Sequence, residues 1–216
     1  MAEFNGIQNL PKSNIVESGY LESMLSNFST SYKLFWFKGI FREVLGGYTE
    51  ITYKHIVARM IAEAWYPVIF FNLSLGVADK LADAVWYIHE TLHVSREEKV
   101  DKIVEYILVS DDKVLNKKIK SFTDFVPYRL IRPFYQREID YERQINSKDY
   151  SDSKVNSIIE QYNKVDQNNA LYILNRVEQR VKISSNWVKY LTDNAAVIEG
   201  WLNYKLINYI QQRNPS

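Results

Sequence analysis

The sequence predicts a mainly α-helical fold, an irregular bundle of several helices with a possible short β element near residues 171–183. Apolar residues recur at helical spacing along most of the 216 residues, and the chain has only 7 glycines and 5 prolines. Such a composition favours long regular elements over a turn-rich β fold. The chain could form two packed units, 1–145 and 150–216, separated near the polar stretch 144–153, or one continuous domain.

The first third of the chain shows the helical pattern clearly. We expect one helix over 17–28 and a second over 32–45, whose apolar residues occupy more than one face and which Gly46-Gly47 would end. Thr52 is a suitable N-cap for a third helix, and we expect Pro67 to end or kink that helix.

The run Ala58–Leu75 is rich in aromatic surface. Within it, four aromatic residues surround Pro67, namely Trp65, Tyr66, Phe70 and Phe71. So much aromatic surface in a short segment should be buried, either in a core or under a partner.

Helical spacing continues through the middle of the chain. Residues 77–92 carry one apolar stripe, and Ser95–Glu98 has the pattern of a capping box for a helix that includes Val100 to Leu108. A short helix over 112–120 follows. The segment 125–134 contains two prolines and is expected to be extended or loosely helical.

The C-terminal part contains the most ambiguous segment. Residues 155–162 regain helical spacing, whereas 171–183 fit both a helix and a strand, and the apolar spacing favours the helix. Ser184 or Ser185 could cap a further helix, and a final helix is expected over 195–212.

The composition excludes several classes of site. The chain has no cysteine, so disulfides, thiolate zinc sites and cysteine nucleophiles are ruled out. We see no secretory signal at the N-terminus and no apolar stretch near the ~20 residues that a membrane helix needs. The expectation is a cytoplasmic protein without a membrane partner.

Positive charge is concentrated between Lys113 and Arg137, although the formal net charge is only +1. This segment holds seven basic residues and a single acid, Asp124. Such an asymmetry can mark a surface for phosphate groups, although a solvated basic face is the commoner explanation. Helical spacing places Lys113, Lys117 and Lys120 on one face, with Arg129 and Arg132 beyond them, and these five are the candidate nucleic-acid-binding residues.

One catalytic pattern is present, His89-Glu90-Thr91-Leu92-His93, which matches H-E-x-x-H. Two histidines spaced by four on a helix can bind one zinc ion, and the intervening glutamate can act as a base for a bound water. The extended pattern with a third histidine is absent, and the only other histidine is His55. Coincidence is therefore the favoured interpretation, with His89 and His93 as surface residues rather than metal ligands.

Several blocks resemble the N-terminal region of bacterial proteins that carry an HNH endonuclease domain. They keep their order along nearly the whole chain and are Ser31–Phe37, Ile56–Val68, Leu73–Leu81, Phe125–Ile131 and Trp201–Pro215. The resemblance implies that a nuclease module, a ββα metal finger that uses a divalent metal, would follow this region. None of that module's signature is present here, so we expect no catalytic residue and no cofactor in this chain.

These observations leave three functional hypotheses. The first is an accessory domain of an HNH endonuclease that positions or recognises nucleic acid, most readily DNA. The second is a protein-interaction or regulatory domain of a defence-type system, in which the aromatic run around Trp65–Phe71 would be partly exposed as an interface anchor. The third is a zinc hydrolase that uses His89, Glu90 and His93. The sequence leaves the oligomeric state open.

Overall fold

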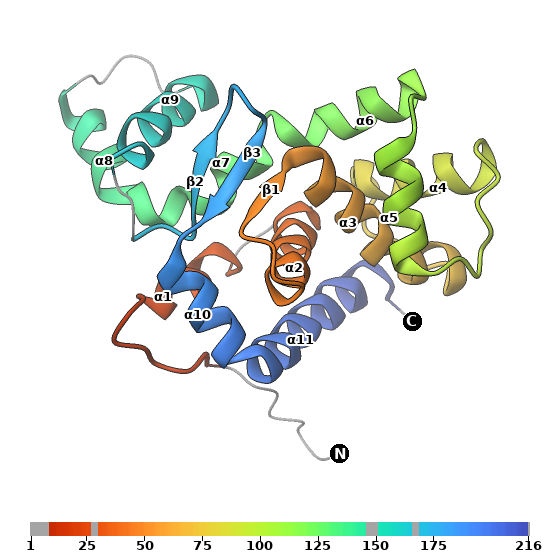
Figure 1. Cartoon of the computed structure of the whole chain (residues 1–216), viewed down its shortest axis with the longest axis horizontal. Helices are drawn as coiled ribbons and strands as arrows, with labels where there is room; N and C mark the ends of the chain where they lie inside the picture. Colours follow the sequence, from red (N-terminus) through yellow and green to blue (C-terminus); the bar gives the residue numbers. More distant parts are fainter. Residues whose placement is uncertain (1–8, 27–29, 146–150, 166–168, 216) are drawn as a thin grey trace.

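The computed structural model describes residues 9–26, 30–145, 151–165 and 169–215 and confirms the mainly α-helical fold with a small β element (Figure 1). The elements of the N-terminal half are α1 (Ser18–Met24), α2 (Tyr32–Leu45), β1 (Glu50–Thr52), α3 (Tyr53–Trp65), the π-helical turn η1 (Tyr66–Phe70), α4 (Lys80–Glu90) and α5 (Val100–Val109). The others are α6 (Lys113–Thr123), α7 (Val126–Ile131), the 3₁₀ turn η2 (Arg132–Tyr135), α8 (Gln136–Ile145), α9 (Asp152–Asn163), β2 (Tyr172–Asn175), β3 (Arg180–Ile183), α10 (Ser185–Asp193) and α11 (Ala195–Arg213).

Helix α3 is the centre of the core, because it packs against α2, α4, α5 and α6. Its N-terminus is fixed by Thr52, whose side-chain oxygen accepts a hydrogen bond from the His55 amide at 3.2 Å. Helix α2 can approach α3 closely because residue 39 is glycine: a Cβ there would lie 3.2 Å from the carbonyl oxygen of Ile56. Four of the five tryptophans are fully buried in this core and around it, namely Trp36, Trp65, Trp187 and Trp201.

The small sheet has the strand order β1-β3-β2, and both pairs are antiparallel. Val181 lies opposite both Ile51 and Leu174, and the Tyr53 amide donates to the Gln179 carbonyl at 2.7 Å. The helix that apolar spacing favoured over 171–183 is therefore wrong, and the short β element is confirmed. Alternate residues of β2 and β3 are buried, as expected for a sheet with one covered face.

Contacts also cross the boundary that the sequence suggests near 144–153. Strand β1 pairs with β3, and both α10 and α11 pack against α2 (Figure 1). Tyr209 on α11 donates a hydrogen bond to the Leu75 carbonyl, and the Asn214 side chain bonds both backbone groups of Ser74. The last helix is thereby fastened to the loop that precedes α4.

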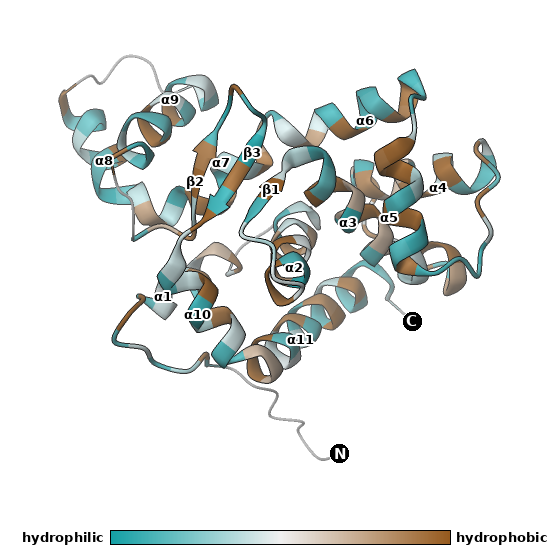
Figure 2. Cartoon of the chain, viewed as in Figure 1, coloured by the Kyte–Doolittle hydropathy of each residue, from teal (hydrophilic) through white to brown (hydrophobic). Residues whose placement is uncertain are grey.

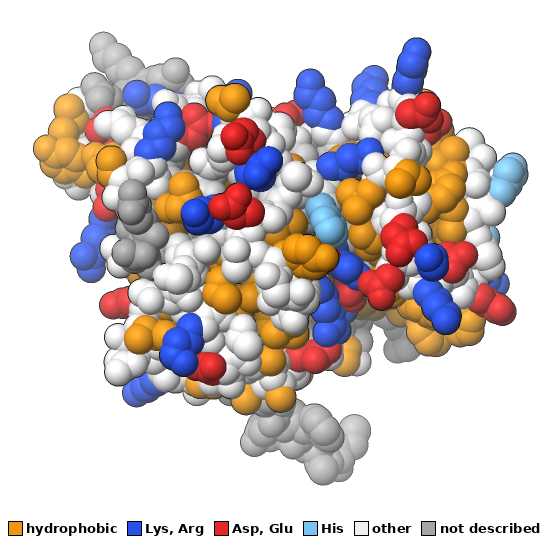
Figure 3. Space-filling view, viewed as in Figure 1, with side chains coloured by type: hydrophobic (Ala, Val, Ile, Leu, Met, Phe, Trp, Pro, Cys, Tyr) orange, Lys and Arg blue, Asp and Glu red, His pale blue; other side chains and the backbone are white. Residues whose placement is uncertain are grey.

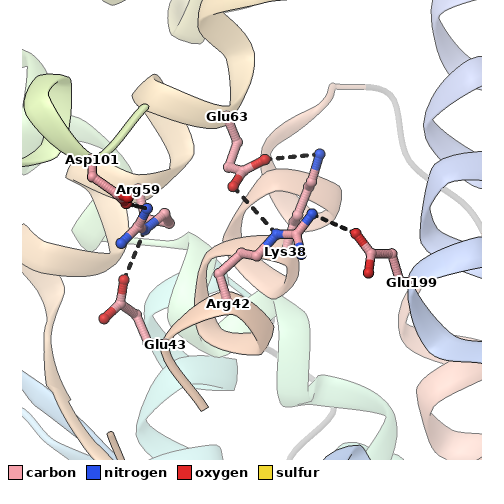
Figure 4. Close-up of polar contacts among 7 residues, drawn as sticks. All are labelled: Lys38, Arg42, Glu43, Arg59, Glu63, Asp101 and Glu199. Carbon is pink, nitrogen blue, oxygen red and sulfur yellow. Dashed lines mark hydrogen bonds and ion pairs between the residues drawn. The ribbon is translucent and has the colours of Figure 1, made fainter. Parts of the chain in front are cut away.

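Buried charge joins α2 to α3 at one point of this core (Figure 4). The Glu43 carboxylate is only 2% exposed and contacts Arg59 at 2.8 Å and His55 at 3.2 Å, while Arg59 also pairs with Asp101 on α5 at 2.7 Å. Burial alone would raise the pKa of Glu43, but the contacts with His55 and Arg59 outweigh it and lower that pKa. The carboxylate therefore remains charged inside the protein.

A second set of ion pairs lies one turn further along the same two helices (Figure 4). Glu63 pairs with Lys38 at 2.9 Å and with Arg42 at 3.4 Å, and Arg42 reaches Glu199 on α11 at 2.6 Å. Each of these groups has a partner of opposite charge within the fold. We therefore assign both sets to packing of the helices rather than to ligand binding.

Candidate functional site

Helix α6 presents three exposed lysines on one side, as its spacing indicates. The Asp112 side chain caps the helix by accepting from the Leu115 amide at 2.7 Å. Leu115, Ile119 and Phe122 are buried, and Figure 2 shows hydrophilic residues along the outer side of α6. Lysine and arginine side chains project from this edge of the molecule (Figure 3). Lys113, Lys117 and Lys120 are exposed, and within the described part of the chain none of them makes an ion pair.

The segment that carries the two candidate arginines is helical. The sequence predicts an extended or loosely helical connection over 125–134, whereas the structure has α7 followed directly by η2. Both prolines lie in the first turn of their elements, where a missing N–H costs no hydrogen bond. Arg129 points from α7 and Arg132 begins η2, so the two side chains are carried by consecutive turns.

Arg129 and Arg132 line a pocket of about 520 Å³ at the surface. Two further cations, Lys33 on α2 and Lys80 on α4, line the same pocket, and Asp152 is the acidic residue among its described lining. Asp152 pairs with Arg129 at 2.6 Å. Among the described lining residues, four are cations and one, Asp152, is an acid.

The start of α2 and the start of α4 are held together by one buried carboxylate. Asp79 accepts hydrogen bonds from the Ser31 amide at 2.7 Å and from the Leu81 amide at 2.9 Å. The Lys80 amide also donates to the Tyr32 hydroxyl at 2.7 Å. This contact brings Lys33 and Lys80 to one pocket although 46 residues lie between them in the chain. Burial raises the pKa of Asp79, and its hydrogen bonds oppose that rise without cancelling it.

Two of the cations that line this basic pocket, Lys33 and Lys80, could not be predicted from the sequence. The charge asymmetry that revealed Arg129 and Arg132 is a property of one continuous segment, and Lys33 and Lys80 lie outside it. Lys113, Lys117 and Lys120 do not line the pocket; their helix leads to it, since Ser121 and Phe122 at the end of α6 are lining residues. The sequence therefore identified a basic face and half of the cations of the pocket beside it.

The H-E-x-x-H pattern does not form the helical arrangement that zinc binding requires. Helix α4 ends at Glu90, and His93 lies beyond it with a left-handed φ of 57°. His89 points back to the protein, with Nδ1 2.9 Å from the Val94 carbonyl oxygen and its ring against Trp65 and Trp86. Across the described residues, no three His, Asp or Glu side chains gather in a way that could hold a metal ion.

The aromatic run around Pro67 is divided between core and surface. Trp65 is fully buried and donates to the Arg96 carbonyl at 3.0 Å. Three others stay at the surface, with Tyr66 39%, Phe70 42% and Phe71 62% exposed. Burial in the core is therefore wrong for these three, because the π-helical turn at Pro67 buries Val68 and Ile69 instead, and burial under a partner stays a prediction. The Arg96 guanidinium lies over the Phe70 ring, 5.6 Å from its centroid.

Among the helices that the structure describes, none has both the length and the apolar character needed to cross a membrane. Comparison with protein-family models, with curated proteins and with solved structures gives no match for this chain.

Proposed function

We propose that this chain is an accessory helical domain that binds nucleic acid through its phosphate groups and supplies no cutting chemistry of its own. The observation that carries the proposal is the pocket lined by Lys33, Lys80, Arg129 and Arg132, at the end of a helix with three exposed lysines. Basic residues arranged in this way contact phosphates and position a nucleic acid without reading its bases.

We further propose that the domain serves an HNH-type endonuclease. The support for this part is the sequence resemblance of the five ordered blocks, among them Ile56–Val68 and Trp201–Pro215. In such a protein the divalent metal belongs to the nuclease module, and this domain would hold the substrate. Sequencing the gene beyond codon 216 tests this part, because an HNH module encoded in frame supports it and a stop codon argues against it.

Fluorescence anisotropy with a labelled DNA duplex tests phosphate binding by α6. The variant carries Lys113→Glu, Lys117→Glu and Lys120→Glu, and a control with the same change in charge carries Lys99→Glu, Lys182→Glu and Lys189→Glu, all outside α6. We expect the α6 variant to bind more weakly on every sequence. The slope of log K against log salt should become shallower by about 0.9 for each phosphate contact removed.

The control separates specific contacts from net charge. The proposal requires the control to retain most of the affinity and the steep salt dependence of the unmodified chain. Equal losses in both variants would mean that only net charge matters, and an absence of duplex binding at low salt would refute phosphate binding altogether.

A second candidate function, a protein-interaction domain, is favoured by the exposed aromatic patch of Tyr66, Phe70 and Phe71. These rings contact one another, with centroids 5.8 Å apart for Tyr66–Phe70 and 5.1 Å for Phe70–Phe71. Clustered exposed aromatics are typical of interface anchors. Light scattering with a Phe70→Ser/Phe71→Ser variant tests it: an oligomer that dissociates supports this function, and a monomer in both cases removes self-association.

A further inference from the structure

A second pocket of about 570 Å³ adjoins the basic pocket, and Phe125 lines both. The chemistry of the second pocket is different, because hydroxyl and amide groups predominate there. Its lining includes Tyr53, Asn156, Ser157, Glu160, Arg176 and Gln179. Both volumes fall within the range of ~300–1,000 Å³ that is usual for small-molecule sites. Two spaces of unlike polarity therefore share Phe125 as a lining residue.

Phe125 is suited to stack with a flat ligand group. It occupies the N-cap position of α7, and 44% of its surface is exposed. The Arg129 guanidinium lies 5.3 Å from the centroid of its ring. Exposed aromatic rings beside cationic groups are the usual platform for nucleobases.

Tyr53, which lines the second pocket, has a buried hydroxyl group that finds no partner among the described residues. Tyr53 is 2% exposed, and its hydroxyl makes no hydrogen bond to any described residue. Burial, with a further contribution from Glu160, raises the pKa of Tyr53, while Arg176 opposes the rise. Tyr53, Glu160 and Arg176 all line this pocket. An unpaired buried hydroxyl is costly and is rare in folded proteins.

The polar groups around it are held in place. The Tyr128 hydroxyl donates to the Glu160 carboxylate, which also accepts from the Arg176 guanidinium at 3.4 Å. Glu160 therefore stays oriented as an acceptor, while Asn156 and Gln179 offer both donors and acceptors. This combination matches the hydrogen-bonding edge of a nucleobase or the hydroxyl groups of a sugar.

We propose that the two pockets together bind one nucleotide, with its phosphates among Lys33, Lys80, Arg129 and Arg132, its base against Phe125 and its polar edge in the pocket lined by Tyr53. The inference rests on the proposed function for the phosphate chemistry and adds the base. Four cations against Asp152 suit a polyphosphate or successive phosphodiesters. The nucleotide can therefore be free or can be the unpaired end of a strand, and the test includes both.

Isothermal titration calorimetry with the full chain tests the inference. The probes are ribonucleoside triphosphates, the matching nucleosides, inorganic tripolyphosphate and a short 5′-phosphorylated single strand. We expect the triphosphates or the single strand to bind more tightly than tripolyphosphate, and the nucleosides to bind most weakly. Preference for the free nucleotide or for the strand identifies the source. Tripolyphosphate binding as tightly as every nucleotide probe would overturn the proposal, and so would no binding of any of them.

Three single variants test which residues bind the phosphates of the ligand and which bind its base. Arg132→Gln should weaken the binding of both tripolyphosphate and the nucleotide. Phe125→Ala should weaken only the binding of the nucleotide, by roughly 5- to 100-fold for one lost stacking contact. Tyr53→Phe keeps the aromatic ring, removes the hydroxyl, and should also weaken only the binding of the nucleotide. Tyr141→Ala, at an exposed aromatic residue on α8 that lines neither pocket, is the control and should bind normally. Equal effects of Phe125→Ala on tripolyphosphate and nucleotide would show a phosphate site without a base site and would refute the inference.

Failure of this inference can be told apart from failure of the proposed function. The α6 variant with Lys113, Lys117 and Lys120 reversed should bind duplex more weakly and keep nucleotide binding, because those lysines line neither pocket. Duplex binding with no nucleotide binding refutes the inference alone. Thermal melting of each variant confirms that the change in binding is not a loss of folding.

Discussion

Lys33 carries a positive charge in an unfavourable place. Burial, and in second place the positive charge of Arg129, lower the pKa of its ammonium group below the ordinary value of 10.5. Between that lowered pKa and 10.5 the unfolded chain binds more protons than the folded chain, so stability rises with pH across this window. At neutral pH the charge on Lys33 therefore costs stability, as is common for groups kept for binding.

The variant Lys33→Met should be more stable than the unmodified chain at neutral pH and should lack the gain in stability at alkaline pH. Methionine keeps an unbranched apolar side chain of similar length and removes the charge. Binding of tripolyphosphate should weaken roughly tenfold, as expected for one charged contact. Urea unfolding across the pH window and calorimetry measure the two effects.

Lys113→Met on the exposed face of α6 is the matched control. It should change neither the free energy of unfolding nor the binding of tripolyphosphate. A Lys33 variant that is less stable at neutral pH would show that the lysine contributes more to packing than its charge costs.

At the same scale, the sequence identified only part of the candidate site. Arg129 and Arg132 could be found because a cluster of like charges in one segment is visible without a structure. Lys33 and Lys80 could not, since each has ordinary neighbours in the sequence and meets the others only through the Asp79 contact between two helix starts. Phe125 looked like one of many apolar residues, and only its exposure between two pockets distinguishes it.

At the scale of elements, the crossing of α2 and α3 depends on the absence of a side chain at Gly39. A Cβ there would lie 3.2 Å from the Ile56 carbonyl oxygen and 3.5 Å from the Cβ of Arg59. The first of these atoms belongs to the backbone of the central helix α3, at the fully buried residue Ile56, and cannot move aside easily. Gly19 in α1 is different, because a Cβ there would meet no atom within 4 Å.

The two glycines should respond oppositely to the same substitution. Gly19→Ala should raise the free energy of unfolding by about 0.5–1 kcal/mol through helix propensity alone. Gly39→Ala should lower it by about 1–2 kcal/mol, since overpacking outweighs propensity. Chemical denaturation monitored by circular dichroism measures both, and a stabilising Gly39→Ala would mean that α2 and α3 can separate at little cost.

The elements that sequence reasoning misplaced have physical causes in common. Strand β1, which lies more than a hundred residues earlier in the chain, pairs with β3 and completes the sheet that the hairpin of β2 and β3 begins. The spacing of apolar residues within 171–183 cannot reveal this partner strand. The capping-box pattern at Ser95–Glu98 forms a turn instead, with the Ser95 hydroxyl accepting from the Glu97 amide, and α5 begins later, at Val100. Tertiary contacts override local preference in both cases.

At the scale of the whole molecule, the C-terminal elements complete the core of the N-terminal part. Helices α10 and α11 cover α2, and β3 is the central strand of a sheet whose edge is β1. Trp201 and Leu202 on α11 are 1% and 3% exposed, so they are core residues rather than surface residues of a separate unit. The helical class and most helices could be read from the sequence, but this mutual dependence required the structure.

A fragment of residues 1–145 should therefore fail to fold cooperatively. Without α10, α11 and β3, the buried faces of α2 and β1 would meet water, at a cost of about 25 cal/mol per Å² of apolar surface. We expect a broad urea transition and strong binding of a hydrophobic dye, in contrast to the full chain. A sharp transition with no dye binding would show that 1–145 is an independent domain.

The fluorescence of the four buried tryptophans can report the unfolding of the protein. Trp36, Trp65, Trp187 and Trp201 are shielded from water in the folded chain, so their emission should shift to longer wavelength when the chain unfolds. None of the five tryptophans lines the basic pocket or the polar pocket beside it. Unfolding can therefore be followed by intrinsic fluorescence in the presence of a ligand, without a label and with little direct quenching by the ligand.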